Sequence, residues 1–166
     1  MGKGKLKRPD REEMAKDFGA AERLLSRNPD LLWRTVGAMV RLAGRTSLGR
    51  LLMERTGRLA GAALAEMEMF GMKTADGPVA AAGEWLKVLE ALNCRYEVGK
   101  VTSGGVEVFM LECPAGLSEK NGKEVCLAGM SADRELVGRL GGRLLIGETI
   151  ADGAGKCHLK VVRAES

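Results

Sequence analysis

Aromatic side chains are scarce in this sequence, at 4% of residues, and it contains one histidine. A core of this composition must be built from leucine, valine, alanine and the nine methionines. Methionine packs adaptably, so such a core suits a pocket that takes an irregular ligand. The same scarcity argues against nucleic acid as a partner, because proteins bind single-stranded bases largely by stacking them on aromatic rings.

Long hydrophobic runs are absent as well. No stretch of 18 apolar residues occurs, and the N-terminus lacks the apolar segment of a secretory signal. We therefore expect a cytoplasmic protein with no membrane-spanning segment. The four cysteines contain no C-x-x-C pair, which excludes a zinc ribbon and a thioredoxin-like motif, and we expect them to be reduced. They are Cys94, Cys113, Cys126 and Cys157.

Positive charge is in modest excess, with a formal net charge of +4 that is concentrated early in the chain. Nucleic acid is the obvious partner for such a patch. No nucleic-acid-binding motif accompanies the charge, so we interpret residues 1–9 as a disordered, solvated basic tail. The 166 residues are enough for one compact domain, with a helical region at 10–93 and a ligand-binding α+β region at 94–166.

Hydrophobic periodicity and capping residues predict helices at 10–26, 30–44, 46–70 and 79–93. In the third of these, apolar residues recur at three- and four-residue steps and predict one buried stripe. That stripe consists of Leu48, Leu51, Leu52, Leu59, Ala62, Ala63 and Met67. Gly57 and Gly61 on the same helix allow another helix to approach closely, either inside the molecule or in a homodimer.

The hydrophobic pattern changes at Cys94 from helical periodicity to strand-like alternation. Alternating apolar residues predict strands at 94–101 and 106–113, a helix at 123–140, and a second hairpin over 143–162. This order predicts an α+β fold in which a four-stranded antiparallel sheet is covered by helices on one side.

The last hairpin holds the most informative residues. If Ala151 lies opposite Lys156, Glu148 falls on an apolar face near Cys157. A buried carboxylate needs a partner, such as a thiol, an arginine, a metal or a ligand. The alternative is a register shifted by one residue, which would turn Glu148 into water.

Several short motifs in this half resemble a known family. They are F-M-L-E-C-P at 109–114, V-C at 125–126, E-T-I-A-D-G at 148–153 and C-H-L at 157–159. Over residues 90–163 the chain resembles the L-2-amino-thiazoline-4-carboxylic acid hydrolase family. This family belongs to a wider superfamily with the vinyl-reductase-type domains and the TRAPP trafficking subunits. The resemblance implies an apolar cavity between helices and sheet, with cysteines pointing toward it.

The resemblance also implies a zinc site in some relatives, built from one glutamate and three cysteines. The matching positions here are Cys126, Glu148 and Cys157, while a further ligand falls at Ala151, which cannot coordinate a metal. Cys113 could take its place if the fold brings it near. Three protein ligands are too few for a structural zinc, but they leave a catalytic zinc site open.

Three functions remain open at this stage. The first is hydrolysis of a small heterocycle whose carboxylate is held by Arg143. Either Glu148 or a metal activates the attacking water, or Cys157 attacks the ring covalently. Cys126 and Cys113 are further catalytic candidates. In the second, the domain binds a small apolar or heterocyclic ligand and acts through a partner protein. In the third, the cysteines are ordinary core residues.

Overall fold

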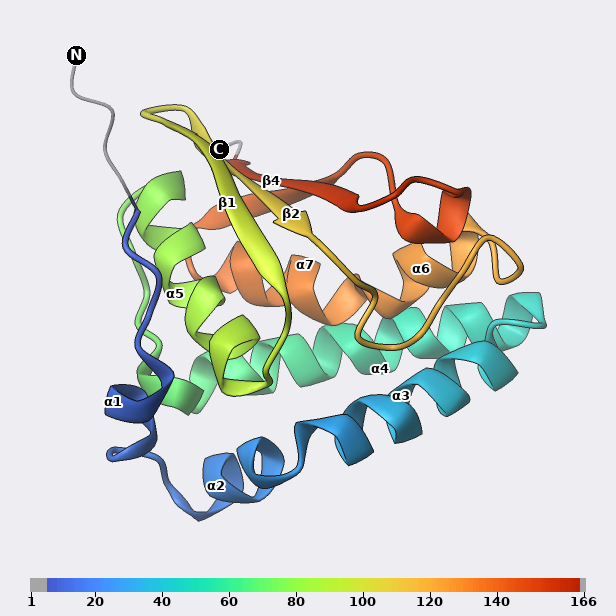
Figure 1. The fold of residues 1–166 in the computed structure, drawn as a ribbon, viewed down its shortest axis with the longest axis horizontal. Helices are drawn as coiled ribbons and strands as arrows, with labels where there is room; N and C mark the ends of the chain where they lie inside the picture. Colours follow the sequence, from blue (N-terminus) through green and yellow to red (C-terminus); the bar gives the residue numbers. More distant parts are fainter. Residues whose placement is uncertain (1–5, 165–166) are drawn as a thin grey trace.

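The computed structural model describes residues 6–164, and within them seven α-helices cover one face of a four-stranded sheet (Figure 1). The central helices α5, α6 and α7 lie under the sheet, and α3 and α4 lie beyond them. The helices are α1 (Arg11–Ala15), α2 (Ala20–Arg27), α3 (Pro29–Ala43), α4 (Ser47–Glu66), α5 (Pro78–Ala91), α6 (Lys123–Gly129) and α7 (Ser131–Arg139). The strands are β1 (Tyr96–Thr102), β2 (Gly105–Met110), β3 (Gly142–Ile146) and β4 (Cys157–Arg163).

The sheet is antiparallel throughout and has the order β1-β2-β4-β3, which confirms the predicted α+β fold. Its inner face is formed by alternate residues, as period-two geometry requires. Val106 and Val108 of β2 and Val161 of β4 are fully buried against α5 and α7. The sheet and the α5–α7 layer therefore enclose the main core.

Two of the predicted helices are divided in the structure. The segment 10–26 breaks between α1 and α2, where Phe18 turns inward and packs edge-on against Phe70 with 5.3 Å between ring centres. The segment 123–140 breaks at Met130, which separates α6 from α7. Both breaks keep an apolar side chain in contact with the core.

The predicted buried stripe of α4 is wrong, because the helix turns the opposite face inward. Leu48, Leu52 and Leu59 are 64%, 54% and 72% exposed. The small residues face α7 instead: a Cβ added at Gly57 would lie 2.0 Å from Ser131 Oγ, and one added at Gly61 would lie 2.2 Å from the Ala132 carbonyl oxygen. The two glycines therefore serve an internal contact with α7, which is one of the two predicted alternatives.

The basic tail is only partly described. Residues 1–5 of the predicted disordered segment lie outside the described residues. In place of disorder, the structure packs Leu6 against the main core and pairs Arg8 with Glu90. Glu90 is 7% exposed and accepts a second hydrogen bond from the Tyr96 hydroxyl, at 2.7 Å. The end of the tail is thus anchored on α5 and β1.

Candidate ligand-binding pocket

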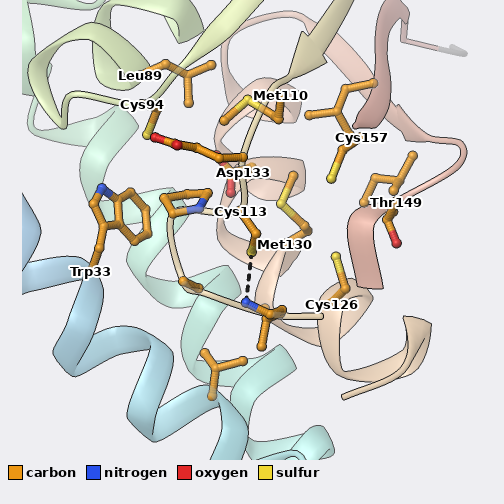
Figure 2. Close-up of a pocket in the computed structure, with 18 of the residues that line it drawn as sticks. Trp33, Leu89, Cys94, Met110, Cys113, Cys126, Met130, Asp133, Thr149 and Cys157 are labelled. Carbon is orange, nitrogen blue, oxygen red and sulfur yellow. Dashed lines mark hydrogen bonds between the residues drawn. The ribbon is translucent and has the colours of Figure 1, made fainter. Parts of the chain in front are cut away.

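A pocket of about 110 Å³ lies between α3, the α5–α7 layer and one end of the sheet. Twenty residues line it, and two of these, Glu112 and Asp133, carry a charged group. Glu112 is exposed and pairs with Arg95, so it marks the solvent side. The rest of the wall is mostly apolar or sulfur-bearing, as Figure 2 shows.

Helix α3 forms the outer wall of this pocket through Trp33 and two valines. The helix can approach because Gly37 has no side chain: a Cβ there would lie 2.1 Å from the Ala115 carbonyl oxygen. The same carbonyl accepts a hydrogen bond from Arg41 Nη1 at 2.8 Å. Trp33 Nε1 donates to the Leu92 carbonyl at 2.9 Å, which fixes the other end of the wall.

All four cysteines line the pocket, as the family resemblance implied. Cys126 comes from α6, Cys157 begins β4, Cys113 follows β2, and Cys94 lies between α5 and β1. The Leu117 N–H donates to Cys113 Sγ at 3.3 Å, drawn as a dashed line in Figure 2. The Ile150 N–H donates to Cys157 Sγ at 3.4 Å. Backbone segments thus hold two of the thiols in place.

Glu148 does not lie on the apolar face, and that prediction is wrong. The strand ends at Ile146, which pairs with Leu159 and not with Val161 as predicted. This shift by two residues preserves the faces, but the chain then leaves the strand. Asp152 accepts a hydrogen bond from the Thr149 backbone N–H at 2.7 Å and another from its hydroxyl, which closes a 3₁₀ turn.

That turn reverses the predicted placement of two neighbouring side chains. Thr149 points inward and is fully buried in the pocket wall, whereas Glu148 is exposed to solvent. Lys123 pairs with Asp152 at 2.9 Å and lowers the pKa of that carboxyl to about 2. The exposed side of the turn is therefore charged, and its inner side is part of the pocket.

The predicted metal ligands are not brought together. Among the described residues, no group of three or more histidine, cysteine or acidic side chains is arranged to hold a metal ion. Cys126 and Cys157 share the pocket, but Glu148 lies outside its wall. Arg143, the predicted carboxylate partner, is exposed on β3 and is also outside the wall.

Asp133 is the pocket residue that the sequence reasoning missed. It stands in the first turn of α7, and Trp85 Nε1 donates to its Oδ1 at 2.9 Å. Desolvation raises its pKa, because the surroundings disfavour the charged form. Its spacing held a signal: Asp133 follows Gly129 by four residues and precedes the buried Leu136 by three, which places it on the inward side of the helix.

No family model and no curated protein sequence matches the chain. A solved structure is similar, however. It is the trafficking protein particle (TRAPP) complex subunit 3 from Naegleria fowleri covalently bound to palmitic acid, with a TM-score of 0.62 and 13% sequence identity. The match covers 83% of this chain and 96% of that one. The chain has the fold of a TRAPP complex subunit.

This similarity supports a TRAPP-like fold. It gives no support to the narrower resemblance to the thiazoline hydrolases. Among residues 6–164, no helix has the length and apolar character needed to cross a bilayer.

The thiol of Cys126 is expected to react slowly with alkylating reagents. Burial, followed by the neighbouring cysteines, raises the pKa of Cys126 to about 11. Because the thiolate is the reactive form, about 0.1% of Cys126 is reactive at pH 8, against about a quarter of a free cysteine. We expect iodoacetamide to modify Cys126 more than about a hundredfold more slowly in the folded protein than in urea. Peptide mass spectrometry over a pH series measures this, and a folded-state rate that levels off by pH 9 would contradict it.

Proposed function

We propose that this domain binds the apolar body of a small molecule, a short acyl chain or a single ring, in the pocket beneath the sheet. The observation that carries the proposal is the pocket itself: about 110 Å³, with 18 of its 20 lining residues uncharged and most of them apolar or sulfur-bearing. Dry cavities of similar size, about 150 Å³, bind benzene in other proteins.

The similar TRAPP subunit supports an acyl chain as the occupant, because that protein is covalently bound to palmitic acid. A chain of that length exceeds the pocket as it stands. Met110 and Met130 both line the pocket, and unbranched methionine side chains move between rotamers at small cost. Their displacement would lengthen the pocket along its wall.

The structure does not support the arrangement on which the prediction of hydrolysis depended. Glu148, the residue given the task of activating water, is exposed and outside the pocket wall. Burial raises the pKa values of Cys126 and Cys157, so these thiols stay protonated and weakly nucleophilic near neutral pH. A catalytic role for them or for Cys113 stays a prediction, and binding is the better-supported function.

A sensing role through a partner protein is the second candidate, and helix α3 favours it. The helix contributes Trp33 and Val36 to the pocket wall, while Leu31 and Leu42 on its other face are 59% and 69% exposed. A ligand that displaces the inner face of α3 would therefore alter an apolar surface that another chain can contact.

Calorimetric titration with 1-alkanols from butanol to decanol tests the binding function. Each added methylene buried in the pocket is worth about 0.8 kcal/mol, so we expect affinity to rise about fourfold per carbon until the pocket is full. The heat capacity change on binding should be negative, because apolar surface is removed from water. An affinity that does not depend on chain length would contradict the proposal.

A further inference from the structure

Asp133 places one acidic group inside a pocket whose other inner residues are uncharged, and most of them are apolar, aromatic or sulfur-bearing. Figure 2 shows it between Cys94 on one side and Cys113 and Met130 on the other. The side chain is half-buried and lines the pocket. The carboxyl is thus available to a molecule in the pocket.

The carboxyl has accepting capacity that the protein leaves unused. Trp85 Nε1 donates to Oδ1, the backbone N–H of Asp133 also contacts the carboxyl, and no other described side chain donates a hydrogen bond to it. An ionised carboxylate has about four lone-pair positions and no donor. Trp85 by itself does not require an acid, because an asparagine oxygen in the same place could accept its N–H equally well.

We propose, building on the binding function above, that the ligand carries a hydroxyl group on its apolar body and that this hydroxyl donates to Oδ2 of Asp133. A hydroxyl both donates and accepts, so it can pair with the carboxyl in either protonation state. An ether oxygen only accepts, so it finds no donor on the ionised carboxylate, and an aliphatic chain neither donates nor accepts. Asp133 is therefore a specificity-determining residue that selects apolar alcohols from apolar molecules of the same size.

The test compares 1-octanol with its isomer heptyl methyl ether, which has the same atoms and no donor. At alkaline pH, where the carboxyl is ionised, we expect the wild-type protein to bind the alcohol about tenfold more tightly than the ether in calorimetric titrations, as one hydrogen bond to a carboxyl implies. In Asp133→Asn the amide oxygen still accepts from Trp85, while the amide nitrogen faces the pocket as a donor. We expect the ratio of the two affinities to fall to about one.

Arg134→Gln provides the matched control, since Arg134 is the next residue on α7 and is exposed. This variant should retain the wild-type ratio, and a circular dichroism melt verifies that both variants are folded. If neither probe binds the wild-type protein, the proposed binding function itself is wrong. Equal affinity for the two probes would leave that function standing and overturn the hydroxyl proposal. A tenfold preference that survives in folded Asp133→Asn would also overturn it.

Discussion

Replacing Gly61 by alanine is expected to lower the melting temperature by about 10 °C. The added Cβ would lie 2.2 Å from the Ala132 carbonyl oxygen and 3.1 Å from Glu135 Cβ. A backbone oxygen cannot turn aside as a side chain can, so α4 and α7 must move apart along their contact. Overpacking of this kind costs about 3 kcal/mol, and 1 kcal/mol corresponds to about 3 °C in a domain of this size.

Gly138→Ala on α7 supplies the control, because nothing lies within 4 Å of a Cβ added there. Alanine is a better helix former than glycine by up to about 1 kcal/mol, so this variant should be slightly more stable than the wild type. The two alanine substitutions, one on each of the two packed helices, should thus shift the melting temperature in opposite directions. A Gly61→Ala protein as stable as the wild type would show that α4 and α7 do not pack as described.

The order of elements and the composition of the sheet could be predicted from the sequence, but the orientation of α4 could not. The helix carries two candidate faces, one of leucines and one of small residues, and periodicity favours the larger apolar residues. In the folded chain the face of small residues is buried, because Gly57 and Gly61 let the backbones of α4 and α7 approach closely. The leucines are left outside, including Leu51, at 47% exposure, and Leu59, at 72%. An exposed apolar face of this kind is typical of contact surfaces.

In the pocket, too, local sequence patterns predicted the direction of some side chains and not of others. The inward direction of Cys126 and Cys157 was predicted, since both sit in regular elements whose period fixes the buried side. Exposure of Glu148 to water was one of two predicted alternatives, but its cause was not predicted: the side-chain oxygen of Asp152 binds the Thr149 backbone and ends the strand early. A polar contact between residues three apart therefore overrides strand alternation over this short stretch.

Replacing Gly129 by phenylalanine is expected to weaken binding of 1-octanol by about a hundredfold. Gly129 ends α6 and lines the pocket, and a Cβ there would meet one atom, Val40 Cγ1, at 3.7 Å. The backbone therefore accepts a Cβ at this position without a clash. The ring would occupy space otherwise taken by about four methylene groups of the ligand, worth about 3 kcal/mol in total.

The same substitution at Gly138 separates pocket filling from a general effect of an added ring. Gly138 is exposed near the end of α7 and outside the pocket wall, so Gly138→Phe should bind 1-octanol as the wild type does. Because the ring of Gly129→Phe fills empty apolar space, that variant should melt no lower than the Gly138→Phe control. Unchanged affinity in a folded Gly129→Phe protein would place the alcohol elsewhere on the molecule. Loss of binding confined to Gly129→Phe would locate the alcohol between α3, α6 and the start of β4.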